Sequence, residues 1–369
     1  MMSNNKLLFV ITGMGLGGAE RQLCILADKF YQRGYEVKII SLSGDTVVRP
    51  DEKNIQIVPL NLKKNPLSFL KVIFNCQKII KDYQPAVVHS HMFHANIIMR
   101  LVGLVFKKPY KLICTAHSKN EGGALRMFVY RLTDRFADVS TNVSKEALEA
   151  FIEKKAFSKA HAEVVYNGID IEKFNYNDER RRAIRQRLNI QDHEKAVLAV
   201  GRLTAAKDYP NLLTAFNALP DHYKLIIIGE GELRSDIESR IQQLNLSSRV
   251  MLLGSINEVH DYYSASDIFV LSSEWEGFGL VVAEAMSCKC IVVCTDAGGV
   301  KEVIGNANFV VPVSNSKALA DKILEMSELS PARKDIIANQ NRNHIVKHFS
   351  INSVIDRWLS IYKTEQVDK

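Results

Sequence analysis

Short apolar runs rich in β-branched residues alternate along the whole chain with segments of helical periodicity. The runs lie at residues 7–11, 37–42, 86–89, 111–116, 164–166, 196–200, 225–228, 250–253, 268–271, 291–294 and 309–311. Such runs, separated by helices, are typical of parallel strands that are covered on both faces. The alternation therefore predicts an α/β fold built on doubly wound parallel sheets.

The chain is long enough for two domains of this kind, because 369 residues exceed the roughly 100–200 of one domain. A charged stretch at 175–194, which includes Arg180, Arg181 and Arg182, carries few apolar side chains and predicts the boundary. We therefore expect one domain over residues 1–175 and a second over residues 190–348. In the last segment, 349–369, apolar residues share one helical face, which predicts a docked helix.

Composition excludes several classes of protein. Hydrophobic residues make up 47% and charged residues 24%, values that exclude a disordered or collagen-like chain. The apolar runs are far shorter than the roughly 20 residues that span a bilayer, and the run at 7–11 is too short for a signal peptide. Six cysteines without a secretory signal indicate reduced thiols and a cytoplasmic protein.

The first half of the chain is basic. Residues 1–175 hold 25 Lys and Arg against 16 Asp and Glu, whereas the remainder is nearly balanced. This charge suits an anionic lipid or a phosphorylated substrate, or serves solubility alone, and no nucleic-acid motif accompanies it. Residues 67–83 show a basic amphipathic pattern with two interpretations: a helix packed on a sheet with its lysines in water, or contact with an anionic membrane.

Each half has glycines directly after a strand. Four glycines between residues 13 and 18, including Gly17 and Gly18, open a helix where backbone N–H groups can approach a phosphate. Their spacing fits the dinucleotide fingerprint, but the second strand ends without the acidic residue that a nicotinamide site needs. A tight turn that packs the helix on the strand is the alternative. Gly229 and Gly231 repeat the arrangement in the second half.

Two cations follow the strand at 196–200. Arg202 and Lys207 lie on a strand-to-helix loop, and ligands of open α/β sheets bind beyond the carboxyl ends of the strands. A guanidinium and an ammonium a few residues apart can neutralise a diphosphate. Solvated surface charges are the alternative interpretation.

Two carboxylates flank the start of a further helix. Glu276 lies at its mouth, and Glu284 lies inside an apolar run, where a carboxylate is costly unless it is paired. Between them, after Phe278, the backbone N–H groups of Gly279 and Leu280 can face a ligand. This suits a ligand with hydroxyls at both ends and phosphates in the middle. An internal ion pair for Glu284 and a capping role for Glu276 are the alternative.

Taken together, these motifs resemble the retaining glycosyltransferases of GT-B family 4. The Glu-x7-Glu pair with Arg202 and Lys207 upstream is the most specific match, and the resemblance covers nearly the whole chain. It implies two Rossmann-like domains facing a central cleft, with the last helix crossing back to the first domain. The other matching motifs are Gly17-Gly18-Ala19-Glu20-Arg21, Val143-Ser144, Asn167-Gly168-Ile169-Asp170, Gly229-Glu230-Gly231 and Ala297-Gly298-Gly299 with Glu302.

The resemblance also implies roles for individual residues. The residues that match Arg202 and Lys207 bind the donor diphosphate, the one matching Glu276 contacts the donor sugar, and the one matching Glu284 holds the ribose. His117 matches a histidine near the transferred sugar, although Ser118 stands where the family often has Asp. The residues expected to be catalytic are His117, Arg202, Lys207 and Glu276. Those expected to bind the donor are Gly17, Gly18, Gly229, Gly231, Phe278, Gly279, Leu280 and Glu284.

The activity implied is transfer of a sugar from a nucleotide-sugar, with a UDP-sugar favoured over GDP-mannose. The implied acceptor is a lipid-linked glycan or saccharide in bacterial surface polysaccharide biosynthesis, such as lipopolysaccharide or capsule. Because the sequence has no Asp-x-Asp motif, we expect no metal cofactor. Peripheral contact of the first domain with the inner face of the plasma membrane stays open. The alternatives are another GT-B enzyme, such as a nucleotide-sugar epimerase, and a non-catalytic sugar-binding subunit.

Two further clusters have the residue types of metal sites. The cysteines at 288, 290 and 294 fit a buried strand better than a metal site, because free Cys is a common core residue. His89, His91 and His94 lie at and after the end of one strand, where we favour a role in lining the acceptor pocket.

Overall fold

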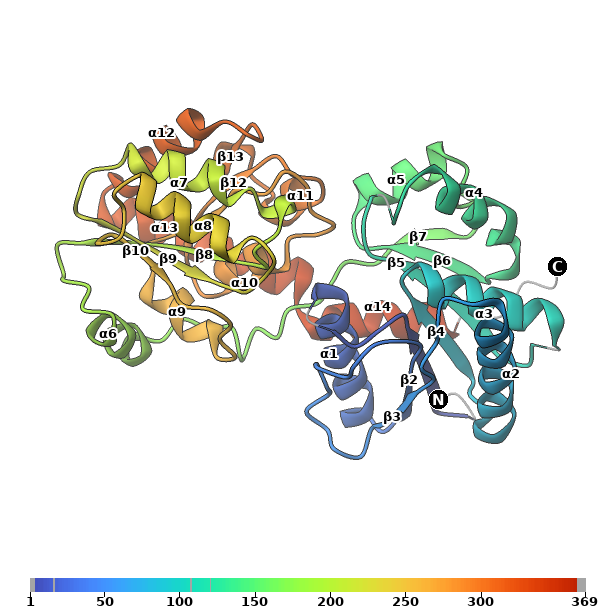
Figure 1. Cartoon of the computed structure of the whole chain (residues 1–369). Coiled ribbons are helices and arrows are strands. Elements are labelled where there is room, and N and C mark those ends of the chain that lie inside the picture. Colours follow the sequence, from blue (N-terminus) through green and yellow to red (C-terminus); the bar gives the residue numbers. More distant parts are fainter. Residues whose placement is uncertain (1–3, 16, 107, 120, 364–369) are drawn as a thin grey trace. The chain divides into compact units, whose positions relative to one another are not determined.

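The computed structural model describes residues 4–15, 17–106, 108–119 and 121–363 and confirms the predicted α/β class. The thirteen strands in these ranges form two wholly parallel sheets flanked by helices (Figure 1). The chain divides into two compact units: unit 1 is Met1–Gly168 with Ile351–Lys369, and unit 2 is Ile169–Ser350. Residues 364–369 of the predicted segment 349–369 lie outside the described residues.

Unit 1 is built on a seven-stranded sheet with the order β3-β2-β1-β4-β5-β6-β7. The strand order reverses between β1 and β4, which makes the carboxyl ends of these strands the place where a ligand is expected. The elements of this unit are β1 (Lys6–Ile11), α1 (Gly18–Gln32), β2 (Glu36–Ser41), β3 (Gln56–Pro59), α2 (Pro66–Tyr83), β4 (Val87–His91), α3 (Phe93–Val105), β5 (Lys111–Ala116), α4 (Ala124–Thr133), η1 (Asp134–Phe136), β6 (Val139–Asn142), α5 (Lys145–Glu153), β7 (Ala162–Val164) and α14 (Ile351–Lys363).

Unit 2 repeats this plan on a six-stranded sheet with the order β10-β9-β8-β11-β12-β13. Here the order reverses between β8 and β11. Its elements are α6 (Asp178–Arg187), β8 (Lys195–Val200), η2 (Ala205–Lys207), α7 (Tyr209–Asn217), β9 (Tyr223–Ile228), α8 (Arg234–Gln243), β10 (Val250–Leu252), α9 (Val259–Ala265), β11 (Ile268–Leu271), α10 (Leu280–Ser287), β12 (Ile291–Thr295), α11 (Val300–Ile304), η3 (Ala307–Phe309), β13 (Val310–Val311), α12 (Ser316–Ser327) and α13 (Pro331–Phe349).

Two strands of unit 1 were not predicted from the apolar runs. β3 is a short edge strand whose residues are only half-buried or exposed, so its sequence lacks a continuous apolar run. β6 is fully buried, yet three of its four residues are polar. Their polar groups are satisfied by neighbours, as in the hydrogen bond of 2.7 Å between the hydroxyls of Thr141 and Thr115.

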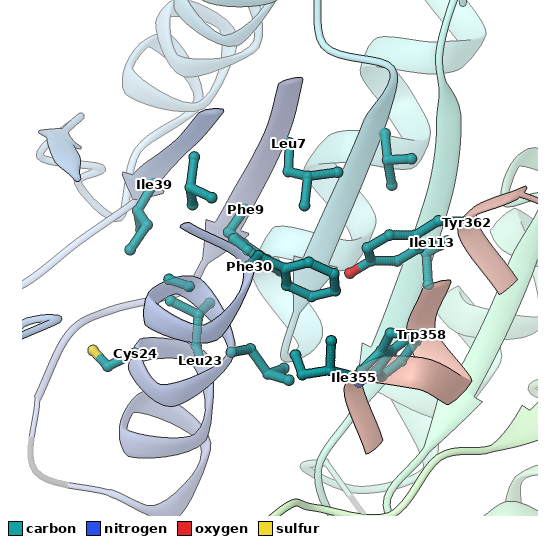
Figure 2. Close-up of a cluster of buried hydrophobic side chains, with 14 of the residues drawn as sticks. Leu7, Phe9, Leu23, Cys24, Phe30, Ile39, Ile113, Ile355, Trp358 and Tyr362 are labelled. Atoms are coloured by element: carbon teal, nitrogen blue, oxygen red, sulfur yellow. The ribbon is translucent and has the colours of Figure 1, made fainter. Parts of the chain in front are cut away.

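The last helix, α14, covers one face of the unit 1 sheet together with α1. Figure 2 shows the ring of Tyr362 beside that of Phe30, and the two stack with centroids 5.3 Å apart. Trp358 and Ile355 fill the same cluster of buried side chains. A Cβ atom on Gly168 would lie 2.6 Å from Ile351 Cδ1, so the chain passes the start of α14 with no room for a side chain.

The charged stretch that was predicted to separate the domains is part of unit 2. It contains the helix α6, whose Arg181 and Arg185 both pair with the carboxylate of Asp267, at 2.7 and 3.1 Å. The residues just before it also pack in unit 2, because Phe174 lies 6.1 Å from the ring of Tyr263. The first segment of unit 1 accordingly ends at Gly168, whereas the end of the first domain was predicted at residue 175.

The other face of the unit 1 sheet is covered by α2 and α3, whose inner side chains form a second buried cluster. On α2, Ile73 and Ile80 are buried, whereas Leu67, Leu70 and Phe74 are 80%, 51% and 60% exposed. The amphipathic pattern of residues 67–83 therefore divides between a face against the sheet and an apolar face in solvent. No helix in the described part of the chain is long and apolar enough to cross a membrane.

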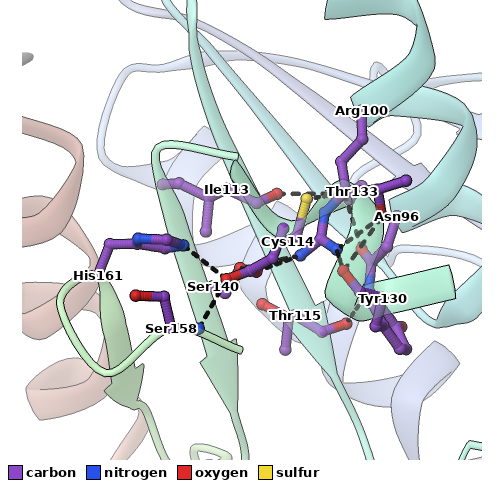
Figure 3. A network of polar contacts seen from close by, with 12 residues as sticks. Asn96, Arg100, Ile113, Cys114, Thr115, Tyr130, Thr133, Ser140, Ser158 and His161 are labelled. Carbon is purple, nitrogen blue, oxygen red and sulfur yellow. Dashed lines mark hydrogen bonds and ion pairs between the residues drawn. The ribbon is translucent and has the colours of Figure 1, made fainter. Parts of the chain in front are cut away.

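A buried guanidinium connects α3 to η1 and β6. Arg100, which is fully buried, donates from Nη2 to Asp134 Oδ1 and to Ser140 Oγ, both at 2.9 Å (Figure 3). His161 Nε2 lies 2.8 Å from the other carboxylate oxygen. Burial alone would raise the pKa of Asp134, but the hydrogen bond with His161 and the charge of Arg100 hold that pKa below its usual value.

Replacing Arg100 with Ala should lower the free energy of unfolding of unit 1 by about 3–5 kcal/mol, because Asp134 would stay buried without its cation. Urea unfolding followed by Trp358 fluorescence in a Trp275→Phe background measures this change. Arg33→Ala removes an exposed ion pair of the same unit and should cost less than about 1 kcal/mol. Equal losses in the two variants would contradict the assignment.

Candidate active site

Unit 2 brings charged side chains together at the carboxyl ends of β8 and β11. Lys207 ends the η2 turn after β8, and its Nζ lies 2.5 Å from Glu276 Oε1. Ser273, which follows β11, donates from its hydroxyl to the same oxygen at 2.7 Å. The side chains of Lys207 and Glu276 are only 18% and 15% exposed, so salt screens this pair less than a surface pair. Two of the residues predicted to be catalytic thus meet in one ion pair.

Arg202 carries the remaining positive charge of this loop. Its side chain is exposed, and it forms no ion pair with any residue in the described ranges. The charge of Lys207, by contrast, is balanced by Glu276. An anion at this edge can therefore pair with Arg202 directly, whereas it must share Lys207 with Glu276.

The glycines after β9 lie against the loop after β8. Gly229 has a φ of +153°, and a Cβ atom there would lie 1.9 Å from the carbonyl oxygen of Gly201. A Cβ atom on Gly231 would lie 2.4 Å from the carbonyl oxygen of Leu203, whose N–H donates to Glu230 O at 2.9 Å. Close packing of the two loops therefore requires both glycines. A contact between their backbone and the donor stays a prediction.

The helix α10 begins at Leu280 with an N-terminus that no side chain caps. Gly279 precedes it with a φ of +88°, a conformation that favours glycine. Glu276 lies in the loop before the helix. The ring of Phe278 is buried and packs edge to face on Phe349 with centroids 5.5 Å apart, so this side chain belongs to the core of unit 2.

Glu284 lies in the second turn of α10 and is half-buried, so it is more accessible than the apolar run around it suggested. The hydroxyl of Tyr263, on α9, donates to Glu284 Oε2 at 2.8 Å. Tyr263 is fully buried, and this burial, together with the carboxylate, raises the pKa of its hydroxyl well above the usual value. The phenol therefore stays protonated and orients the carboxylate.

In unit 1, Gly17 and Gly18 lie at the start of α1, as predicted. Gly17 is the N-cap in an extended conformation, and no side chain caps the helix there. A Cβ atom on Gly17 would lie 2.3 Å from Glu20 Oε2, so that carboxylate reaches back over the helix start. A carboxylate there interacts favourably with the helix dipole and competes with any phosphate for the same position.

His117 follows β5 at the carboxyl edge of the unit 1 sheet. Its Nε2 lies 3.0 Å from Nδ1 of His91, the last residue of β4. Its backbone N–H donates to Glu121 Oε1 at 2.8 Å, and Tyr130 donates to the other oxygen of that carboxylate at 2.5 Å. Burial lowers the pKa of His117 to about 4, so the imidazole is neutral near pH 7.

The three histidines of the His-x-His-x2-His motif have different environments. The ring of His89 lies between Tyr362 and Thr115, with hydrogen bonds of 2.8 and 2.7 Å. His91 faces His117, and His94 is exposed on α3. In the part of the chain that the structure describes, no three His, Cys, Asp or Glu residues are placed to hold a metal ion.

Sequence reasoning missed three side chains that support these sites, and it did not predict the contact of His91 with His117. Ser273 and Tyr263 hold the two carboxylates of the Glu-x7-Glu pair, and Glu121 holds the backbone of His117. His91 was expected only to line a pocket. Tyr263 follows no spacing rule, because it reaches Glu284 from another helix. Ser273 lies three residues before Glu276, and Glu121 lies four residues after His117, each pair on one loop, and these spacings are the only sequence signal.

Comparison with known proteins identifies the family. A model of glycosyl transferases group 1 matches residues 180–343, and a model of glycosyltransferase family 4 matches residues 16–173. An N-acetylgalactosamine-N,N'-diacetylbacillosaminyl-diphospho-undecaprenol 4-alpha-N-acetylgalactosaminyltransferase of Campylobacter jejuni is 29% identical, over 89% of this chain and 92% of its own. A UDP-Gal:alpha-D-GlcNAc-diphosphoundecaprenol alpha-1,3-galactosyltransferase of Escherichia coli is 25% identical, over 81% of each chain.

Among solved structures, Anabaena HepE in complex with UDP and glucose covers 98% of this chain and 100% of its own, with a TM-score of 0.86 and 21% identity. A glycosyltransferase of Rickettsia africae covers 98% of both chains, with a TM-score of 0.87 and 23% identity. Two parallel, doubly wound units with these neighbours define the GT-B fold class. The chain belongs to glycosyltransferase family 4, and it is a glycosyltransferase.

Acid should destabilise unit 1, because burial lowers the pKa of His89 and His91 well below the usual value and that of His117 to about 4. Between about pH 6.5 and 4 the unfolded chain binds protons at these positions and the folded chain does not. The free energy of unfolding should therefore decrease as the pH is lowered through this window, by about 1.4 kcal/mol per pH unit for each histidine. Glu121, whose pKa burial raises, offsets part of the loss.

Urea unfolding at pH 7, 6 and 5, followed by Trp358 fluorescence in the Trp275→Phe background, measures this slope. The matched variant His91→Asn removes one of the three groups and should reduce the slope by about 1.4 kcal/mol per pH unit. Equal stability at pH 7 and pH 5 would contradict the neutral state assigned to the three imidazoles.

Proposed function

We propose that this enzyme transfers a sugar from a UDP-sugar to a lipid-linked or saccharide acceptor, with retention of anomeric configuration, in bacterial surface polysaccharide biosynthesis. The observation that carries the proposal is the cluster at the carboxyl edge of the unit 2 sheet. There the pair of Lys207 and Glu276, fixed by Ser273, lies on loops that also carry Arg202. These are the positions that match the donor-binding residues of the family.

The chemistry follows from the charges. As the bond between the sugar and the diphosphate breaks, negative charge grows on the leaving group, and cations aimed at that charge stabilise the transition state. Arg202 supplies one cation, and Lys207 supplies the second when the diphosphate takes the place of Glu276 as its partner. Glu276, released in this way, accepts hydrogen bonds from sugar hydroxyls. Glu284, oriented by Tyr263, accepts a hydrogen bond from the ribose.

The two protein cations neutralise the diphosphate without a divalent metal in this proposal. The sequence has no Asp-x-Asp motif, the pattern that carries a metal-bound diphosphate in other transferases. Activity after treatment with EDTA tests this point directly. Loss of activity with EDTA, restored by Mn²⁺ or Mg²⁺, would overturn it.

The relatives support the donor and the acceptor class. The named enzyme of Escherichia coli uses UDP-Gal, and both named enzymes act on glycans carried by diphospho-undecaprenol. Other relatives are named for the biosynthesis of amylovoran and, putatively, of teichuronic acid, which are bacterial polysaccharides. Differential scanning fluorimetry with UDP and GDP tests the base, because a ligand stabilises only a protein that binds it. Stabilisation by GDP alone would overturn the choice of UDP.

Removing either cation should reduce kcat more than it changes the KM for the donor, because the charge that it balances grows in the transition state. We expect Arg202→Ala and Lys207→Ala each to lower kcat by about 10²–10³-fold, as measured by UDP release from a panel of UDP-sugars with an acceptor. Lys322→Ala, which changes a half-buried lysine of α12 paired with Glu325, is the control. Full kcat at saturating donor in both variants would contradict the assignment.

Glu276→Gln should separate binding from turnover. Without its carboxylate partner, Lys207 is available to phosphate, so UDP alone should bind the variant more tightly than wild type. Transfer should fall at the same time, because the amide accepts hydrogen bonds from the sugar less strongly than a carboxylate. Isothermal titration with UDP and the UDP-release assay measure the two effects. Weaker binding of UDP by Glu276→Gln would contradict the shared-lysine model.

The same assays separate the alternative functions. A nucleotide-sugar epimerase would convert the donor without forming a glycosidic bond, and a sugar-binding subunit would bind the donor without releasing UDP. The presence of all four residues, Arg202, Lys207, Glu276 and Glu284, favours a catalytic enzyme.

We further propose that unit 1 works at the inner face of the plasma membrane, in contact with anionic lipid. Eight large apolar side chains that are more than half exposed lie on α2, α3 and α4, three helices that pack side by side (Figure 1). Exposed lysines accompany them on and just before α2, at Lys63, Lys64, Lys71 and Lys78. We call the eight side chains the apolar face; they are Leu67, Leu70, Phe74, Leu104, Val105, Leu125, Phe128 and Leu132.

Apolar side chains enter the interface of a bilayer while neighbouring lysines pair with anionic headgroups. Leu70→Ser combined with Phe74→Ser should therefore weaken binding to phosphatidylglycerol vesicles by at least tenfold, since a buried Leu or Phe contributes about 1.5–3 kcal/mol. Co-sedimentation measures binding, and Val47→Ser, which changes an exposed apolar residue elsewhere in unit 1, is the control. Unchanged sedimentation of the double variant would contradict this contact.

A further inference from the structure

Two neighbouring strands of unit 1 each lead to a histidine at the carboxyl edge of the sheet. β4 ends at His91 and β5 at Ala116, so His117 follows directly. In the register of the two strands His91 lies opposite Thr115. His117 is two residues beyond Thr115, so both imidazoles project from the same face of the sheet. Their rings come within hydrogen-bond distance, with His91 Nδ1 and His117 Nε2 3.0 Å apart.

His91 is held rigidly in this position. His91 is 1% exposed. Its ring lies against the ring of His89, with centroids 4.1 Å apart, and against the ring of Phe9, with centroids 5.8 Å apart. Its second nitrogen, Nε2, is buried and has no hydrogen-bond partner among the residues described. The only polar contact that the structure gives this ring is therefore the one to His117.

The unpartnered nitrogen decides where the proton lies. Both rings are neutral, since burial lowers the pKa of each, so a single hydrogen occupies the contact. If His117 donated it, His91 would carry its own hydrogen on Nε2, as a buried N–H without an acceptor. If His91 donates it, Nε2 keeps only a lone pair. Buried N–H groups without partners are rarer than acceptors without partners, which favours His91 as the donor.

The backbone of His117 is fixed by a separate chain of hydrogen bonds. Its N–H donates to the buried carboxylate of Glu121, which accepts from the hydroxyl of Tyr130 as well. Asn96 in turn donates to that hydroxyl at 3.0 Å. Within the described ranges nothing hydrogen-bonds to His117 Nδ1, so this atom is available to a ligand.

We propose that His91 is a positioning residue that donates from Nδ1 to His117 Nε2 and thereby fixes His117 with its hydrogen on Nδ1. His117 then presents an N–H donor to an oxygen of the bound sugar or phosphate and is not a general base. The inference rests on the proposed function, in which His117 contacts the transferred sugar. It adds the tautomer of His117 and the residue that sets it.

Side-chain NMR tests the tautomer without any assay of activity. In protein labelled with ¹⁵N-histidine, long-range proton–nitrogen spectra distinguish protonated from unprotonated ring nitrogens, and His117→Gln and His91→Asn assign the two rings. We expect Nδ1 to be protonated and Nε2 unprotonated in both. A proton on Nε2 of His117, or a charged imidazolium at pH 7, would overturn the proposal whether or not the enzyme transfers sugar.

Kinetics then separate positioning from a merely structural role. Asn places an amide N–H near the position of Nδ1, so His91→Asn should keep kcat within about threefold of wild type. His91→Gln places its amide near the position of Nε2, and His91→Phe has no hydrogen-bond donor. Both variants should lower kcat about tenfold with little change in the KM for the sugar donor. His193→Gln, on an exposed histidine of unit 2 that lies outside both sites, is the matched control.

Thermal melts of the three His91 variants show which of them fold, and kcat is compared among the folded variants. Equal kcat values for folded His91→Asn and His91→Gln would overturn the positioning role. Full activity of His117→Ala would show instead that the proposed function of His117 is wrong. The tautomer of His117 is decided separately, by the NMR measurement.

Discussion

Backbone contact between the loops beyond β8, β9 and β11 is the constraint on which the unit 2 site depends. The N–H of Glu274 donates to Ala206 O at 2.9 Å, and the hydroxyl of Ser272 donates to Lys207 O at 2.7 Å. A Cβ atom on Gly298 would lie 2.3 Å from Glu276 O, so a third loop closes on the same backbone. The main chain on both sides of the Lys207–Glu276 pair is therefore fixed before any ligand binds, which reduces the reorganisation that binding and catalysis require.

The ion pair of Lys207 and Glu276 also restricts which ligands can bind at this site. A lysine that is already balanced by a carboxylate attracts a distant anion less than a lone lysine does, so specificity depends on a ligand that satisfies both partners at once. A diphosphate joined to a sugar meets this condition, because its phosphates suit Lys207 and its hydroxyls suit Glu276. Inorganic phosphate satisfies only the first. In the proposed function, Arg202, which is exposed and has no ion-pair partner among the described residues, provides the attraction at longer range.

Most of the fold could be predicted from the sequence, because strands buried on both faces need continuous apolar runs. The prediction failed at the exposed edge strand β3 and where burial is achieved by polar pairing. β6 was missed because Ser140 is satisfied by Arg100 and Thr141 by Thr115, contacts that no local pattern reveals. Glu276 and Glu284 could be proposed as site residues from the sequence, because they lie eight residues apart on one loop and the helix that follows it. Tyr263, which orients Glu284 from another helix, could not be found in this way.

The two carboxyl edges use different chemistry, and the difference follows from burial. The unit 2 edge keeps its ions partly exposed, where Lys207 and Glu276 can stay charged and exchange partners. The unit 1 edge buries its polar side chains, and burial leaves imidazoles neutral, as the lowered pKa of His91 and His117 shows. A neutral edge cannot stabilise a departing diphosphate by charge. It can hold hydroxyl groups with directed hydrogen bonds, whose geometry depends on which ring nitrogen carries the proton.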